Sequence, residues 1–101
     1  MGDNGYIGSI IPGHDEYTCW LCGANGRGKM DRHEVFRGAY RQKSKELGLW
    51  VHLCHSPCHQ PIIHSNGEED ERLRIEAQEY AMAYYGWTKE RFIKEFGKSF
   101  V

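Results

Sequence analysis

The sequence of 101 residues contains no apolar run close to the length of about 18 residues that a membrane-spanning helix requires. Its first segment, residues 1–16, has acidic side chains and lacks the basic stretch that opens a secretory signal peptide. We therefore expect neither a membrane span nor a signal peptide, and we expect a cytosolic protein. No internal repeat or low-complexity tract is visible, so one small domain is predicted.

The sequence also has almost no net charge, with 13 Lys and Arg side chains against 14 Asp and Glu. That average argues against a nucleic-acid partner, but it hides a segregation of charge along the chain. Residues 27–45 carry seven basic and two acidic side chains, whereas residues 65–79 carry six acidic and two basic ones. A nearly neutral chain can thus present one basic face, although solvated helix faces would give the same pattern.

A chain of this length buries only about two-thirds of the surface that its unfolded form exposes, so its core alone gives little stability. A disulfide or a bound metal is therefore expected to add stability to the fold. The sequence supplies four cysteines, Cys19, Cys22, Cys54 and Cys58. Since disulfides are disfavoured in a reducing compartment, cysteines in paired motifs indicate a metal site there, most often zinc.

The spacing of the cysteines predicts one structural zinc site. Cys19-x2-Cys22 and Cys54-x3-Cys58 place two thiol pairs on two turns that a folded hairpin can bring together. Four thiolates form a closed tetrahedral shell, which in small zinc modules contributes about 10–16 kcal/mol to folding. Free buried cysteines or a redox dithiol are the alternatives, but the second pair and the lack of a βαβ pattern favour zinc. Because three residues separate the second pair, His55 or His59 stays an alternative to Cys58.

Secondary-structure signals predict an α+β domain over residues 17–101, preceded by an extended or frayed, flexible arm over residues 1–16. Strands are expected over residues 29–36 and 49–53, and a basic helical segment over residues 39–47, ending at Gly48.

Two helices are predicted in the C-terminal third. The first is capped by Ser65 or Asn66 and stops at Gly86, and the second runs from the cap Thr88 to Gly97. Helical periodicity predicts an apolar stripe on the first helix and an inward face on the second. The stripe residues are Leu73, Ala77, Tyr80, Ala81 and Tyr84, and the inward residues are Phe92, Ile93 and Phe96.

Three histidines lie near the cysteine motifs and suggest a second, open metal site. His33 lies on the predicted strand of the basic segment, whereas His59 and His64 follow the last cysteine. Zinc binding would draw these segments together, and a divalent ion beside a basic stretch suits phosphodiester chemistry. Any one of these histidines alone is more often a surface or hydrogen-bonded residue. His14 and His52 are assigned no role.

Taken together, four segments resemble the HNH endonuclease family, and in particular its small phage-encoded members with a four-cysteine zinc site. The segments are Cys19 to Cys22, Asp31 to Phe36, Gly48 to Cys54, and Cys58-His59 with His64. The resemblance implies a small zinc-stabilised ββα-metal fold, treble-clef-like, with C-terminal helices, and metal-dependent cleavage of DNA. It makes His33, His59 and His64 the ligands of the catalytic metal.

The family's motif has a second His where this sequence has Glu34, and no Asn lies between Glu34 and Cys54. Three options follow. Glu34 is the general base, or Glu34 binds the metal while His33 is the base, or the site is inactive and the module only binds DNA. Because neighbouring strand residues point to opposite faces, His33 and Glu34 can share a site only at a strand end or a bulge.

The sequence therefore predicts a metal-dependent DNA endonuclease of HNH type with little sequence readout, with His33, Glu34 and His59 as catalytic residues. Arg37, Arg41 and Lys43 are expected to hold backbone phosphates. The catalytic ion would be Mg, Mn, Ni or Zn, and the protein a monomer or weak dimer in the cytoplasm, that of a bacterial host if it is phage-encoded. The alternatives are an inactive zinc-stabilised nucleic-acid-binding module and a protein-interaction module that docks through the acidic residues 68–79.

Overall fold

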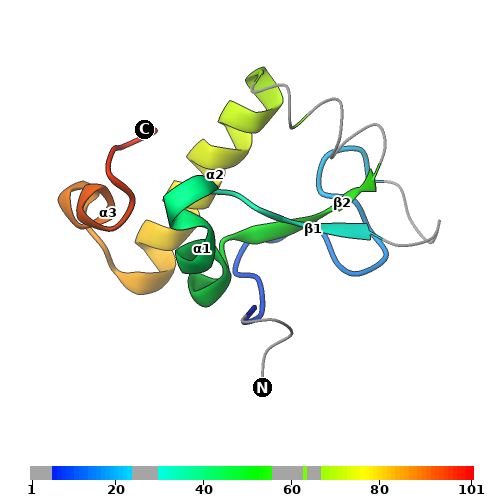
Figure 1. Ribbon diagram of the computed structural model, residues 1–101, viewed down its shortest axis with the longest axis horizontal. Helices are drawn as coiled ribbons and strands as arrows, with labels where there is room; N and C mark the ends of the chain where they lie inside the picture. Colours follow the sequence, from blue (N-terminus) through cyan, green and yellow to red (C-terminus); the bar gives the residue numbers. More distant parts are fainter. Residues whose placement is uncertain (1–5, 24–29, 56–62, 64–66) are drawn as a thin grey trace.

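The computed structural model describes residues 6–23, 30–55, 63 and 67–101, and it confirms the α+β class (Figure 1). The elements, in chain order, are β1 (Met30–Glu34), the 3-10 turn η2 (Gly38–Tyr40), α1 (Arg41–Leu47), β2 (Trp50–Cys54), α2 (Glu68–Tyr85) and α3 (Lys89–Phe96). None of the helices in these ranges is long and apolar enough to cross a membrane.

The two strands form an antiparallel ribbon in which Met30 lies opposite Cys54 and Glu34 lies opposite Trp50. Both strands lie close to their predicted ranges. The connection between them carries α1, which ends at Gly48 as predicted, with a φ of +73°. A side chain there is excluded for a second reason, because a Cβ would lie 2.5 Å from the carbonyl oxygen of Gly8. The glycine thus lets the N-terminal segment pack against the end of α1.

The described part of the predicted arm, residues 6–16, is irregular but anchored. The backbone N–H groups of Ile7 and Ile10 donate to the carbonyls of Lys45 and Gly48, at 3.1 and 2.9 Å. Ile11 is 3% exposed and belongs to the hydrophobic core. The two adjacent isoleucines before Pro12 form too short an apolar signal to predict this docking from the sequence.

The core joins the inner face of the ribbon to the three helices. Its buried members include Val51 and Leu53 of β2, Leu73, Ala77 and Ala81 of α2, and Phe92 and Phe96 of α3. Phe36, just after β1, packs its ring against the ring of Phe96 at 4.6 Å between centroids. These contacts confirm Leu73, Ala77, Ala81, Phe92 and Phe96 as the inward residues.

The predicted stripe is wrong at its aromatic positions. Tyr80 and Tyr84 are 39% and 68% exposed, and Ile93 of α3 is 39% exposed. In their place α2 buries Gln78, whose amide donates to the Ser99 hydroxyl and whose oxygen accepts from the backbone N–H of Phe100. Gln78 can be buried because the C-terminal tail supplies its hydrogen-bond partners. The periodicity of apolar residues does not predict a buried polar side chain at this position.

The helix ends mostly follow the sequence signals. The Thr88 hydroxyl caps α3 by accepting from the backbone N–H of Arg91, and Gly86 and Gly97 end α2 and α3 with positive φ. The exception is the start of α2, where the N-cap is Gly67 rather than Ser65 or Asn66.

One acidic side chain of α2 is not part of a solvated face. Asp70 is fully buried, and its Oδ2 accepts from Nη2 of Arg37 at 2.7 Å and from Nη2 of Arg74. Arg37 lies in the link between β1 and η2, so this carboxylate ties the ribbon to α2. The two arginine side chains are only 28% and 26% exposed.

We expect the substitution Asp70→Ala to lower the free energy of unfolding by about 2–4 kcal/mol, because it leaves two partly buried guanidinium groups without their carboxylate. Urea unfolding of the zinc-loaded chain measures this. The matched control is Glu69→Ala, which removes the neighbouring carboxylate from an exposed pair with Arg72 and should change stability by less than about 0.5 kcal/mol. Equal losses for the two variants would contradict the assignment.

Candidate functional site

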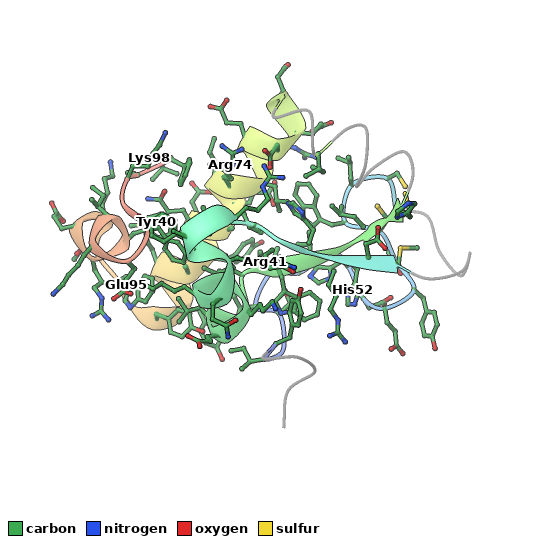
Figure 2. The ribbon with its side chains drawn as sticks, viewed as in Figure 1. Tyr40, Arg41, His52, Arg74, Glu95 and Lys98 are labelled. Atoms are coloured by element: carbon green, nitrogen blue, oxygen red, sulfur yellow. The ribbon has the colours of Figure 1, made fainter. Side chains whose placement is uncertain are left out.

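Three cysteines meet at one end of the ribbon. Cys19 and Cys22 come from the turn before β1, and Cys54 is the last residue of β2. Their Sγ atoms all lie within 4.8 Å of one another. Figure 2 shows sulfur atoms gathered at this end of the ribbon, away from α1 and α3. The structure therefore brings together three of the four cysteines predicted to bind zinc; Cys58 lies outside the described residues.

Local hydrogen bonds hold the cysteine turn against β2. The backbone N–H of Trp20 donates to the carbonyl of His52 at 2.8 Å, and the N–H of Cys22 donates to Sγ of Cys19 at 3.5 Å. The Arg72 guanidinium of α2 lies 4.9 Å from the Trp20 ring centroid. The turn is thus fixed between the ribbon and the start of α2.

The spacing of the sulfur atoms suits a tetrahedral zinc ion. With zinc–sulfur bonds of about 2.3 Å, tetrahedral geometry separates the sulfurs by about 3.8 Å. Sγ of Cys22 and Sγ of Cys54 are 3.9 Å apart, far longer than the roughly 2.05 Å of a disulfide. Cys19 is fully buried, Cys54 is partly buried and Cys22 is exposed. The cluster is consistent with a structural zinc site.

The fourth ligand stays a prediction. His59, like Cys58, lies outside the described residues. His55 does lie near the cluster in sequence, but it is not a member of the three-cysteine group, and its Nδ1 is 2.8 Å from the carboxylate Oδ2 of Asp31. This contact holds the His55 ring on β1, so Cys58 stays the predicted ligand, with His59 as its alternative.

His33 and Glu34 lie on opposite faces of the ribbon. The antiparallel register is regular through both residues, with His33 opposite Val51 and Glu34 opposite Trp50. His33 is 2% exposed and shares its face with the core residue Val51. The strand end does not turn the two side chains toward one site, so the structure does not bring them together. His59 and His64, the other predicted ligands, lie outside the described residues.

The Glu34 carboxylate is occupied on its own face. One oxygen accepts from Nε of Arg41 at 2.6 Å, and the other accepts from the hydroxyl of Tyr6. Glu34 is 7% exposed. These contacts tie the start of α1 and the N-terminal segment to the ribbon, which is a structural role.

The three side chains predicted to hold phosphates each bind a carboxylate of this chain. Arg37 pairs with Asp70, and Arg41 pairs with Glu34. Lys43 lies 3.1 Å from a carboxylate oxygen of Glu95 and donates to its backbone carbonyl at 2.9 Å. Hydrogen bonds from Lys43 and then from Arg91 hold the pKa of Glu95 below its usual value. A phosphate at any of these cations would compete with an internal partner.

Two histidines to which the sequence assigns no role, His14 and His52, face a cavity. Nδ1 of His14 and Nδ1 of His52 are 2.9 Å apart, and the backbone N–H of His52 also donates to Nδ1 of His14. Nε2 of His14 is 3.1 Å from the Ser9 hydroxyl, which donates to the carbonyl of Trp50. The cavity, about 470 Å³ in volume, is lined by both histidines together with Arg32 and Trp50.

Since Nδ1 of His14 accepts a backbone hydrogen bond, its ring is neutral with the proton on Nε2. Burial, followed by the nearby His52, lowers the pKa of His14 to about 4. The pKa of His52 is lowered by burial and then by Arg32. No signal in the sequence pairs these two residues, because they lie far apart in the chain and no motif includes both.

The depressed pKa of His14 predicts an acid-sensitive contribution to stability. The unfolded chain binds a proton near pH 6.5 and the folded chain only near pH 4, so the contribution is full above pH 6.5 and lost as pH falls toward 4. From about pH 7 to about pH 5 the native chain should lose about 1–2 kcal/mol more than His14→Gln, a figure reduced for partial exposure. Urea unfolding at both pH values measures it. Parallel losses in the two proteins would contradict the prediction.

Comparison of the chain with known protein families, with curated proteins and with solved structures finds no match.

Proposed function

We propose that this chain is a zinc-stabilised DNA endonuclease of HNH type, which uses a divalent metal and reads little sequence. The order of its parts supports the proposal. The turn with Cys19 and Cys22 comes first, followed by the antiparallel ribbon of β1 and β2 and then by α2. Cys54, at the end of β2, completes the cysteine cluster with the turn. This is the order expected of a ββα-metal element built into a treble-clef-like zinc scaffold.

The observation that carries the proposal is the position of His33. It lies in β1 on the inner face of the ribbon, and the last residue of the partner strand, Cys54, belongs to the cysteine cluster. In the proposed site His33 holds a divalent ion together with His59 and His64, which follow β2 in the chain. Such an ion, Mg, Mn, Ni or Zn, would stabilise the charge on the scissile phosphate and on the leaving oxygen.

Glu34 has no part in the proposed chemistry. Because its carboxylate binds Arg41 and Tyr6 on the opposite face, it supports the fold around α1. Both active options that the sequence leaves open use Glu34, either as the base or as a metal ligand; the proposal departs from them by keeping His33 alone of the two at the reacting centre.

Nicking of supercoiled plasmid by the zinc-loaded chain tests the proposal, with Mg, Mn, Ni or Zn added in separate reactions. We expect conversion of supercoiled to open-circular DNA with at least one of these ions and none without added metal. Absence of nicking with all four would overturn the proposal.

A second candidate, an inactive zinc-stabilised module that binds nucleic acid, is favoured by one observation. The residue in the place of the family's second His, Glu34, points away from His33 and is bound by Arg41. Under this alternative, the chain shifts DNA in a gel but nicks none of it.

A further inference from the structure

A second cavity, about 240 Å³ in volume, lies on the helical side of the molecule, away from the cysteine cluster. Three cations and four aromatic rings line it: Arg37, Arg74 and Lys98, and Phe36, Tyr40, Phe96 and Phe100. They come from the link after β1, from η2, from α2, from the end of α3 and from the tail after α3. Figure 2 shows Tyr40, Arg74 and Lys98 on these separate segments.

The cavity has a fixed aromatic wall. The rings of Phe36 and Phe100 are 5.4 Å apart with an interplanar angle of 35°, and Phe36 is 4% exposed. The backbone N–H of Phe100 donates to Oε1 of Gln78 at 2.6 Å, which holds the tail in place. The volume lies below the roughly 300–1,000 Å³ of pockets for drug-sized ligands, so it suits one planar group.

The rim of the cavity is positive. Arg37 and Arg74 share the buried carboxylate of Asp70, and Lys98 adds a third cation to the lining. Lys98 is exposed, has no acidic partner in the described part of the chain, and places Nζ 5.0 Å from the Phe100 ring centroid. The Arg74 guanidinium also lies over this ring, 5.7 Å from its centroid. A planar group that stacks on Phe100 would displace the two cations from the ring face and have an ammonium and a guanidinium beside it.

We propose that this cavity binds one unstacked nucleobase of single-stranded DNA, with the adjoining phosphate on Lys98 and Arg74. Aromatic faces beside a positive groove bind single strands because every base has a face that stacks and every phosphate is anionic. The inference rests on the proposed function only in taking DNA as the partner. Of the predicted phosphate ligands, Arg37 lines this cavity, whereas Arg41 and Lys43 do not.

Binding of fluorescent oligonucleotides to the zinc-loaded full chain, followed by anisotropy without added divalent metal, tests the inference. An oligothymidylate is compared with an abasic strand of equal length and equal charge. We expect about tenfold tighter binding of the oligothymidylate, the effect of stacking one base. Equal affinities would overturn the inference, since a purely electrostatic surface does not distinguish the two strands.

Two variants locate the contact. Lys98→Ala should weaken binding of the oligothymidylate and lower the slope of log affinity against log salt by about 1. Its control is Lys94→Ala, which removes another exposed lysine, from α3 outside the cavity, and should leave affinity within about twofold. Phe100→Leu keeps an apolar side chain but no aromatic face, so we expect the preference over the abasic strand to disappear.

Equal effects of Lys98→Ala and Lys94→Ala, or a preference that survives Phe100→Leu, would overturn the inference. Thermal unfolding of each variant confirms that it is folded. Because no cleavage is measured, the outcome is independent of plasmid nicking: a chain that nicks DNA without preferring the oligothymidylate contradicts this inference alone, and one that prefers it without nicking contradicts only the endonuclease proposal.

Discussion

Removal of zinc is expected to unfold the chain. Metal binding contributes about 10–16 kcal/mol to folding in small zinc modules, whereas whole domains of this size are stable by about 5–15 kcal/mol. The cluster joins the turn before β1 to the end of β2, so its loss releases both sides of the ribbon. Far-UV circular dichroism during titration with a strong chelator, with zinc release measured in parallel, should show one zinc per chain and a coincident loss of structure.

Two substitutions near the cluster sharpen this prediction. Cys54→Ser removes a cluster ligand and should abolish zinc retention and folding, whereas His55→Ala, at the next position, should keep both because His55 contacts Asp31 instead. Cys58→Ser is expected to behave like Cys54→Ser, and His59→Ala to retain the structural zinc. A chain purified without zinc, or one that stays folded in chelator, would refute the site.

The second large effect is expected at His33. If the chain cleaves DNA as proposed, His33→Asn should lower the rate of metal-dependent plasmid nicking at least about 100-fold, the scale of removing an acid–base or metal-binding group from a reacting centre. Glu34→Gln should keep the rate within about tenfold, because the amide oxygen of Gln can still accept from Arg41 and its amide N–H can donate to the Tyr6 hydroxyl on the opposite face. Initial rates on supercoiled plasmid at saturating metal measure both.

Both variants must be shown to be folded, since His33 and Glu34 are 2% and 7% exposed. Zinc content and the thermal unfolding midpoint serve that purpose, and Asn is chosen because it leaves less of a cavity than Ala. Loss of nicking in Glu34→Gln with full activity in His33→Asn would reverse the assignment and make Glu34 the base.

Local signals in the sequence predicted the elements because each depends on neighbouring residues. Gly48, Gly86 and Gly97 end their helices with the positive φ that glycine adopts most readily, and Thr88 caps α3 through its own side chain. The Cys19-x2-Cys22 spacing likewise predicted a turn whose thiols converge with a third. These features can be predicted from neighbouring residues alone, without the positions of distant segments.

The wrong predictions involved side chains whose partners lie far away in sequence. From the sequence, Asp70 is one of several acidic residues expected on a solvated helix face, yet it is fully buried and paired with Arg37. Tyr84 fits an apolar stripe, but no core surface covers it. Periodicity indicates that a helix has an inner face, whereas the neighbours packed against it decide where that face lies.

By itself, the sequence determined the α+β class, the ends of most helices and the pairing of cysteines suited to zinc. Only the tertiary structure decided which charges are neutralised, because Arg37, Arg41 and Lys43 meet Asp70, Glu34 and Glu95 through the fold. It also separated His33 from Glu34 by strand register. Local structure depends on neighbouring residues, so residue spacing in the sequence predicts it. Contacts between distant segments depend on how the ribbon and helices pack, and no short motif predicts that packing.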